Sequence, residues 1–300
     1  MSLRRTKNLW HLALGFLWFV GCIEPRSNSA ATSSQDGVKN GDCRNLTSNS
    51  LSLVNGQVDT NEVYSPVIEL KTGLSICTGT FVSDNTLLTA AHCVKQSEPG
   101  GGIKAIIQGK TVVPIKTLAQ SIPEGATREP KDDVAVVLFA DGTADEWFAV
   151  SQKAPQVGQR ITIVGFGQTD FIRNNASDEL RRFGFNTITE LADDGATIKY
   201  ELPVTCHGTP LGKDAMAGRG DSGGPLFTKD GLVGIVSRGE ISQAKLIEYD
   251  ANLITPAMNS FFRNSMVEGA KIDGISTVEK GASSASDGLS LSPTAHQPDR

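Results

Sequence analysis

The sequence lacks a surplus of basic residues, a long hydrophobic run and an internal repeat, and each absence excludes a class of protein. Lys and Arg total 28 against 33 Asp and Glu, which gives a net charge of −5. A nucleic-acid-binding protein shows a basic surface instead, so no nucleic-acid partner is expected. The apolar run at residues 12–20 is too short for a transmembrane helix. No segment recurs at a fixed period, which argues against a solenoid or a propeller.

Aromatic residues are also scarce, at 6%, but the remaining composition is that of a folded protein. Apolar residues make up 39% and charged residues 20% of the 300 positions, which excludes a wholly disordered or collagen-like chain. The length suits one or two domains. The five cysteines are an odd number, so at least one is not part of an internal disulfide.

The N-terminus predicts export. Three basic residues precede the apolar run: Arg4, Arg5 and Lys7. This is the order of a signal peptide, which we place at residues 1–21. Phe19-Val20-Gly21-Cys22 resembles a bacterial lipobox, which implies cleavage after Gly21, a lipid on Cys22 and an outer-membrane or cell-surface lipoprotein. The alternative is an ordinary signal peptide cut near Ala30-Ala31, which gives a periplasmic or secreted protein.

Two polar segments flank the part of the chain that has β-type patterning. Residues 22–52 are rich in Ser, Asn, Thr, Gly and charge and have no apolar period, so they are interpreted as a tether or pro-segment. Residues 269–300 have a similar composition and are interpreted as a flexible tail. The folded domain is therefore expected at residues 53–268.

Within that domain, short apolar runs separated by Gly-rich breaks predict an all-β fold. The predicted strands include Val67–Leu70, Thr86–Thr89, Val134–Phe139, Ile161–Val164, Thr197–Leu202 and Leu232–Val236. Thr255-Pro256 is typical of a helix start, and apolar residues follow it at helical spacing. Short strands with one terminal helix favour an antiparallel barrel architecture.

Three segments of this domain carry the side chains of nucleophilic catalysis. They are Leu88-Thr89-Ala90-Ala91-His92-Cys93, Asp132-Asp133-Val134-Ala135-Val136-Val137-Leu138 and Gly220-Asp221-Ser222-Gly223-Gly224-Pro225-Leu226. Taken singly, each has an ordinary structural explanation, such as a core histidine or a turn aspartate. Their conjunction within one domain-sized stretch favours a shared site.

The residue types match the chemistry of a serine nucleophile. A serine hydroxyl needs an adjacent base, and His92 can take the Ser222 proton and later donate it to the leaving group. Asp133 can hold the imidazole in one tautomer and stabilise its charged form. The backbone N–H groups of Gly220 and Ser222 can form an oxyanion hole.

These motifs, in the chain order His, Asp, Ser, resemble those of the chymotrypsin-like (trypsin-like) serine protease family. The resemblance covers residues 53–268, with Gly165-Phe166-Gly167 as a further match. It implies two six-stranded antiparallel Greek-key β-barrels with a C-terminal helix and the active site between the barrels. It also implies a bacterial exported endopeptidase that acts as a monomer on protein or peptide substrates through an acyl-enzyme, without a metal or organic cofactor.

The resemblance also assigns covalent features. It implies a disulfide between Cys77 and Cys93. Leu53-Val54-Asn55-Gly56 looks like the mature N-terminus of the family, so the chain is expected to be a zymogen cut between Ser52 and Leu53. The new α-amino group of Leu53 would then pair with Asp221. Whether Cys43 pairs with Cys206 or both remain free thiols is open.

The substrate pocket is also inferred from the resemblance. The residue six before the nucleophile is Met216, at the expected base of the pocket, and Gly239 leaves one wall open. Counting back from Tyr249 places Ile247 on the other side, so an apolar P1 residue is expected, P1 being the residue on the amino side of the scissile bond. Arg219 and Arg238 are expected near the pocket rim, and Ser237 is a further expected pocket residue. A slip in the loop alignment would bring Asp214 closer.

Two other functions are compatible with parts of the pattern. One is a catalytically silent protease-fold binding protein at the cell surface, which the intact triad argues against. The other is a serine esterase; an α/β-hydrolase esterase has its triad in the chain order Ser, Asp, His, whereas the order here is His, Asp, Ser.

Overall fold

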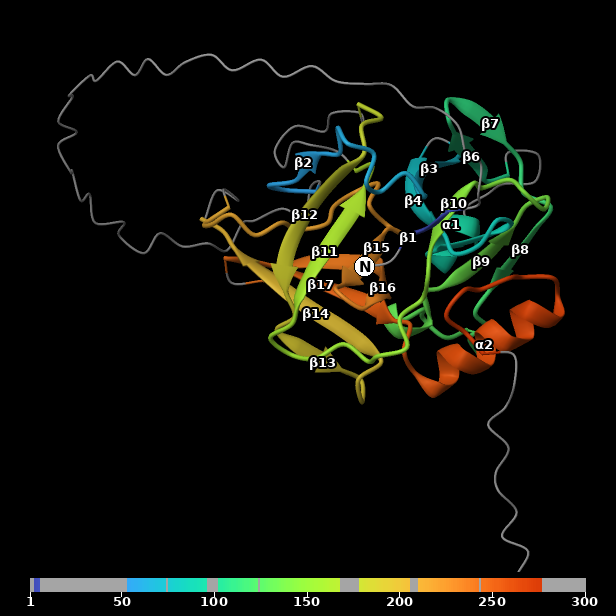
Figure 1. Cartoon of the computed structure of the whole chain (residues 1–300). Helices are drawn as coiled ribbons and strands as arrows, with labels where there is room; N and C mark the ends of the chain where they lie inside the picture. Colours follow the sequence, from blue (N-terminus) through green and yellow to red (C-terminus); the bar gives the residue numbers. More distant parts are fainter. Residues whose placement is uncertain are drawn as a thin grey trace, which may run out of the picture.

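The computed structural model describes residues 3–5, 53–73, 75–95, 102–123, 125–167, 178–205, 210–242 and 244–276 (Figure 1). The expected lipidation site and the proposed partners Cys43 and Cys206 lie outside these ranges, as do the tether and most of the expected signal peptide. Within the described ranges, no helix has both the length and the apolar character needed to cross a membrane.

The described residues form two large antiparallel sheets, which confirms the all-β class (Figure 1). The first has the order β7-β6-β3-β4-β5-β9-β8. Its strands are β3 (Val67–Thr72), β4 (Ser75–Phe81), β5 (Thr86–Thr89), β6 (Lys104–Ile107), β7 (Lys110–Val112), β8 (Lys116–Ala119) and β9 (Ala135–Leu138). Six of these are consistent with the expected six-stranded unit, and the short β7 extends its edge.

The second sheet has the order β13-β14-β17-β16-β15-β11-β12-β2. Its strands are β2 (Gln57–Val58), β11 (Arg160–Gly165), β12 (Arg182–Thr187), β13 (Glu190–Ala192), β14 (Thr197–Pro203), β15 (Pro225–Thr228), β16 (Gly231–Ser242) and β17 (Lys245–Asn252). The short strands β2 and β13 stand at its two edges. A separate antiparallel pair joins β1 (Leu3–Arg5) to β10 (Glu146–Phe148).

The apolar runs predicted as strands are largely buried in the structure. All residues of β5 and β9 are buried, for example. Where the two sheets meet, the Tyr64 ring lies 5.2 Å from that of Phe183 and 6.0 Å from that of Phe227. Phe148 packs on Phe227 at 4.6 Å. Aromatic contacts of this kind contribute about 0.5–1.5 kcal/mol each beyond their buried area, so they help hold the two halves together.

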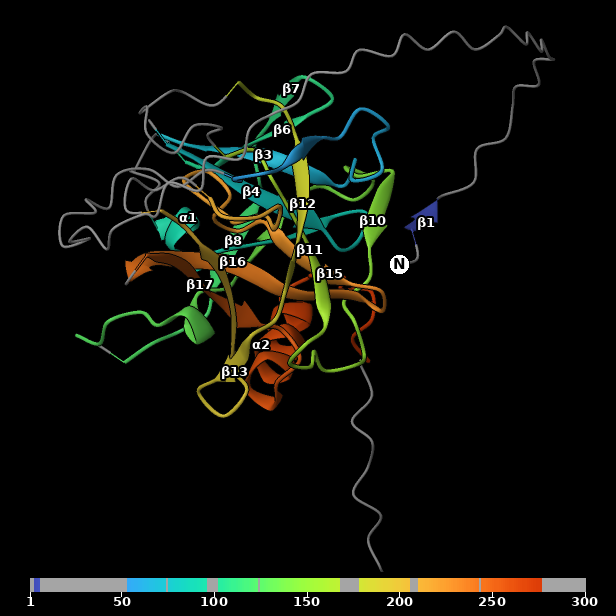
Figure 2. The ribbon, with the colours of Figure 1, turned by 90° about the vertical axis from the view of Figure 1, so that its left-hand side faces the viewer.

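The predicted C-terminal helix is α2 (Pro256–Val267). Its N-cap is Thr255, whose side chain accepts a hydrogen bond from the Met258 N–H, and proline occupies the first helical turn. Met258 and Phe262 are buried in the same apolar cluster as the first sheet. In Figure 2 the helix lies below β16 and β17, on the side away from β6 and β7.

The packed region extends to Ser276, so the expected boundary at residue 268 is too early. Ala270 and Ile272 are buried, and the carbonyl of Asp273 accepts a 2.8 Å hydrogen bond from the Val150 N–H. Between them, Lys271 Nζ lies 2.9 Å from a carboxylate oxygen of Asp141. The composition of this segment is polar, but its apolar residues alternate with paired polar ones and dock on the sheet.

The disulfide expected from the resemblance is present between Cys77 and Cys93, with a Cα–Cα distance of 6.3 Å. Cys77 lies on β4 and Cys93 on the short helix α1 (Ala91–Lys95) that follows β5. Both residues are buried. The bridge therefore fixes the helix that carries His92 to the centre of the first sheet.

Replacing both Cys77 and Cys93 by Ala should lower the free energy of unfolding by about 3 kcal/mol, the loop-entropy value for a closed loop of this length. Thermal unfolding followed by circular dichroism measures the change. The control is a reductant, which should lower the Tm of the wild type but not that of the double variant. Equal Tm values for the wild type and the double variant without reductant would contradict a stabilising role of the disulfide.

Candidate active site

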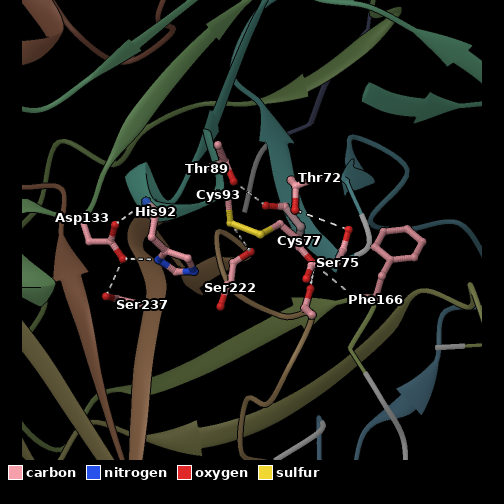
Figure 3. The surroundings of a disulfide bond; sticks show 12 residues. Thr72, Ser75, Cys77, Thr89, His92, Cys93, Asp133, Phe166, Ser222 and Ser237 are labelled. Carbon is pink, nitrogen blue, oxygen red and sulfur yellow. Dashed lines mark hydrogen bonds and ion pairs between the residues drawn. A yellow bond between two sulfur atoms is a disulfide. The ribbon is translucent and has the colours of Figure 1, made fainter. Parts of the chain in front are cut away.

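Asp133 lies where the two sheets meet, directly after a short 3-10 helix, η1 (Pro130–Asp132). Its carboxylate is buried and accepts three hydrogen bonds (Figure 3). The His92 N–H donates to Oδ1 at 2.8 Å, and His92 Nδ1 lies 2.6 Å from Oδ2. The Ser237 hydroxyl donates to Oδ2 at 2.8 Å. One carboxylate thus holds a residue of α1 and a residue of β16.

The charge of Asp133 follows from these contacts. Burial by itself would raise the pKa of its carboxyl group, but the hydrogen bonds and the charge interaction with His92, together with the bond from Ser237, lower it below the usual value. Asp133 is therefore ionised at neutral pH. An ionised carboxylate requires a donor at His92 Nδ1, which leaves Nε2 as the basic nitrogen.

His92 projects from α1 with its side chain 31% exposed. In Figure 3 its ring lies between Asp133 and Ser222, beside the Cys77–Cys93 disulfide. Ser222 flanks the same disulfide, since its carbonyl oxygen lies 3.7 Å from Cys93 Sγ. Among the described contacts, His92 Nε2 and the Ser222 hydroxyl are not hydrogen-bonded, and bonds of this kind commonly tighten only when substrate binds.

The backbone around the nucleophile is tied to the first sheet by Thr78. The Thr78 N–H donates to the Ser222 carbonyl at 2.8 Å, and its hydroxyl donates to the Gly220 carbonyl at 2.8 Å. Gly223 has a φ of +83°, and a Cβ there would lie 2.0 Å from Thr89 Oγ1, so only glycine fits. Among the described residues, the N–H groups of Gly220 and Ser222 have no acceptor. Both are therefore available to a substrate oxyanion.

Asp221, between these two donors, is fully buried. Its carboxylate accepts hydrogen bonds from the N–H of Gly167 at 2.8 Å and of Gly218 at 2.9 Å. A Cβ at Gly165 would lie 2.0 Å from Asp221 Oδ1, which explains why this segment is rich in glycine. Burial raises the pKa of Asp221 to about 7, although these backbone donors and the charge of Arg182 favour the ionised form.

The expected mature N-terminus docks on the segment that leads into Asp221. Leu53 and Val54 are buried. The Val54 N–H donates to the Met216 carbonyl at 2.8 Å, and the Met216 N–H donates back at 3.2 Å. Asp214 is exposed, and its carbonyl accepts a hydrogen bond from the Asn55 side chain. Met216 therefore supports the N-terminal segment.

A cavity of about 260 Å³ opens beside Ser222. Its lining residues come from the nucleophile loop, β16 and β17: Gly218, Arg219, Ser222, Val236, Ser237, Arg238, Gly239, Glu240, Ile241 and Glu248. Four residues expected at the pocket are thus found there. The two expected to make it apolar, Met216 and Ile247, are not among the lining residues, and neither is Asp214.

The register of β17 explains the position of Ile247. The pairing of β16 with β17 shifts at a bulge between Ile235 and Arg238, after which Gly239 lies opposite Glu248. Successive side chains of a strand alternate between the two faces of a sheet. Glu248 is therefore buried at the cavity, whereas Tyr249 is half-buried and its hydroxyl donates to Glu240.

Sequence analysis missed two buried acids of β17, Glu248 and Asp250. Asp250 Oδ1 accepts a 2.9 Å hydrogen bond from the Ser237 N–H. Burial raises the pKa of both carboxyl groups. The spacing of two acids on alternate positions of a strand was the available signal, but alternation alone does not reveal which face is buried.

Among the described residues, one group of potential metal ligands reaches the site: Cys77, His92 and Cys93. The two sulfur atoms are bonded to each other, so neither is a thiolate, the form that binds zinc. His92 Nδ1 is engaged by Asp133. This group is therefore accounted for by the disulfide and the catalytic histidine.

Replacing Ser237 by Ala should lower kcat/KM by roughly 10-fold, because a hydrogen bond to a charged group is lost from Asp133. Peptide hydrolysis measured against pH, with Tm as the check on folding, tests this. Ser242→Ala on the same strand but outside the cavity is the control. An unchanged kcat/KM in folded Ser237→Ala would show that Asp133 does not need this donor.

Comparisons with known proteins agree with this geometry. The Trypsin family model matches residues 54–254. Trypsin eta of Drosophila erecta is 27% identical over 220 residues, covering 63% of this chain and 80% of the relative.

Solved structures share the fold. Neuropsin, a serine protease of mouse brain, superposes with a TM-score of 0.56 and 17% identity, covering 71% of this chain and 100% of the other. An inactivated protease paralogue of the scabies mite gives a TM-score of 0.53 and 14% identity, covering 74% of this chain and 100% of the other. On the family match and the arrangement of His92, Asp133 and Ser222, this chain belongs to the trypsin family of serine proteases.

Proposed function

We propose that this protein is an endopeptidase in which Ser222 is the nucleophile, His92 the general base and acid, and Asp133 the residue that orients His92. The observation that carries the proposal is the ionised, buried Asp133, which accepts from both His92 Nδ1 and Ser237. It leaves His92 Nε2 basic, and the His92 ring lies between Asp133 and Ser222 (Figure 3). Ser222 in turn lines the cavity. All these groups belong to one chain, so a monomer is sufficient.

The reaction follows from these positions. The Ser222 hydroxyl adds to the carbonyl carbon of the scissile bond, while His92 Nε2 takes its proton. The carbonyl oxygen becomes an oxyanion and accepts from the N–H groups of Gly220 and Ser222, each worth about 3 kcal/mol. The tetrahedral intermediate then collapses: its C–N bond breaks, and His92 protonates the leaving amine. In the second half-reaction, His92 takes a proton from water, and the water oxygen adds to the acyl carbon. The bond to the Ser222 oxygen then breaks, and His92 returns the proton to Ser222 as the acid leaves.

Two rival functions remain distinct from this one. The first is a silent binding protein, and the fold also occurs in a scabies mite paralogue that is described as inactivated. The hydrogen-bonded Asp133–His92 pair here favours catalysis. The second is an esterase, which would use the same three residues. Hydrolysis of a peptide substrate distinguishes the proposed endopeptidase from an esterase. The expected apolar P1 preference loses its support, because it rested on Met216 and Ile247.

Replacing Ser222 by Ala should reduce the hydrolysis of a protein substrate such as casein by several orders of magnitude, because the triad residues act as a unit. Ser260→Ala, which removes an exposed hydroxyl from α2, is the matched control. Both variants should keep the wild-type Tm. Casein hydrolysis at the wild-type rate by folded Ser222→Ala would rule out the mechanism, and activity on esters alone would support the esterase.

We further propose that the protein is exported, that its precursor is anchored through a lipid on Cys22, and that cleavage between Ser52 and Leu53 activates it. The docking of Val54 on Met216 supports the last step, as does the buried carboxylate of Asp221. A cationic α-amino group at Leu53 would pair with that carboxylate. An unpaired buried charge costs about 3–5 kcal/mol, which would otherwise disfavour the conformation of the oxyanion loop.

N-terminal sequencing and intact mass of the active species should show a chain that begins at Leu53. The intact mass of the uncut precursor should show a lipid on Cys22.

In the processed enzyme, Asp221→Asn should lower kcat/KM by about 100-fold, because the charge partner is lost. Asp214→Asn, on the exposed part of the same segment, should not. Full activity in a chain with an intact Ser52–Leu53 bond would contradict the zymogen proposal.

A further inference from the structure

A second cavity, of about 790 Å³, lies outside the active site and is larger than the cavity beside Ser222. Neither His92 nor Ser222 lines it. Its walls come from β3, β6, the start of β10 and the chain around Phe166. Five of its lining residues are acids: Glu62, Glu69, Asp145, Glu146 and Glu179. The term acidic groove refers to this cavity.

The two basic residues that line the acidic groove do not balance these acids. Arg181 Nε pairs with Asp59 Oδ2 at 2.9 Å, and its guanidinium group also donates to the Val67 carbonyl at 3.2 Å. Lys110 is exposed. The groove therefore keeps a surplus of negative charge, which attracts cations.

Glu69 is the acid of the groove that lacks a partner of its own. It lies on β3 opposite Ile106 of β6, and its exposed fraction is 3%. Burial raises the pKa of its carboxyl group, and no hydrogen bond from a described residue lowers it. The nearby Lys71 pairs instead with Glu179 at 3.0 Å. A buried carboxyl group without a hydrogen bond is costly, so a donor that enters the groove would stabilise Glu69.

The shape of the acidic groove favours a long organic cation over a metal ion. Among the described residues, only Cys77, His92 and Cys93 bring three potential metal ligands together, so the acids of the groove do not form such a cluster. The groove also has apolar walls, which include Ile106 and Phe166. A Lys or Arg side chain fits both features, because its aliphatic stem packs on apolar surface while its charged end reaches a carboxylate.

The acidic groove reaches a strand edge at Glu146, the first residue of β10. Among the described strands, β10 pairs only with β1, antiparallel, and Arg5 lies opposite Glu146. Figure 2 shows β1 beside β10 at the margin of the molecule. The proposed removal of residues 1–21 would leave this edge without a strand partner, and such an edge is a template for another extended chain.

We propose that the acidic groove and the edge of β10 together form a second binding site, which takes an extended polypeptide segment of a partner protein that carries Lys or Arg. Its main chain adds to β10 as an antiparallel strand, as β1 does. Its basic side chains enter the groove toward Glu69. The site is separate from the catalytic cavity, so the inference does not depend on the proposed hydrolysis.

The test uses residues 22–300 with Ser222→Ala, so that no probe is cut. The probe is the fluorescent peptide Ser-Leu-Arg-Arg-Thr-Lys, which has the sequence of residues 2–7. Fluorescence anisotropy should show saturable binding. The peptide with Gln in place of both Arg should bind at least about 10-fold more weakly, because charge-assisted hydrogen bonds are lost. Methylation of the three central backbone nitrogens should also weaken binding, because strand pairing needs the N–H donors.

Replacing Glu69 by Gln in the same protein keeps the size of the side chain but removes its charge. The Kd of the probe should rise by about 10- to 100-fold. Glu190→Gln is the matched control, because Glu190 is an exposed acid of β13 at the far edge of the second sheet. It should change the Kd by less than about 3-fold, since exposed charges interact weakly. Both variants should keep the parent Tm, and an unchanged Kd in folded Glu69→Gln would overturn the proposal.

Crosslinking locates the bound probe. A benzophenone group in place of the peptide's Leu should label β10 or the acidic groove, as mapped by mass spectrometry. Labelling confined to residues 218–241, which line the catalytic cavity, would overturn the proposal, as would equal affinity for the Arg and Gln peptides. Labelling of Ser222 by a fluorophosphonate in the unsubstituted chain tests the proposed catalysis separately.

Discussion

The site depends on one interaction, the acceptance of three hydrogen bonds by the carboxylate of Asp133. Two come from His92 on the first half of the molecule and one from Ser237 on the second. The carboxylate stays ionised although it is buried, because these donors outweigh the cost of burial. The same contacts orient the catalytic base and join the strand that lines the pocket to the helix that carries His92.

Three further buried acids lie on the second half of the molecule: Asp221, Glu248 and Asp250. Asp221 accepts from backbone N–H groups that glycines bring close. Asp250 accepts from the Ser237 N–H, which holds the strand beneath the catalytic residues. Oε2 of Glu248 and Oδ2 of Asp250 have no hydrogen-bond partner among the described residues.

Much of this could be predicted from the sequence, because the decisive residues lie in short local motifs. His92, Asp133, Ser222 and the cap of α2 were assigned from neighbouring residues, and the Cys77–Cys93 bridge from the family resemblance that the motifs carry. The pocket wall could not be assigned in this way. A bulge in β16 shifts the register of β17, and a shift of one residue exchanges Ile247 for Glu248 at the cavity. The boundary after α2 was also missed, because docking of Ala270 and Ile272 depends on tertiary contacts.

The central claim is that Ser222 forms an acyl-enzyme with the help of the Asp133–His92 pair. The most direct measurement is acid quenching of the enzyme during turnover of an activated peptide ester, followed by peptide mapping with mass spectrometry. We predict an acyl group on Ser222 in the wild type, and acylation slowed by about 10⁴-fold in Asp133→Asn, where the histidine tautomer is wrong. An acyl group on another residue, or undiminished acylation in folded Asp133→Asn, would contradict the account.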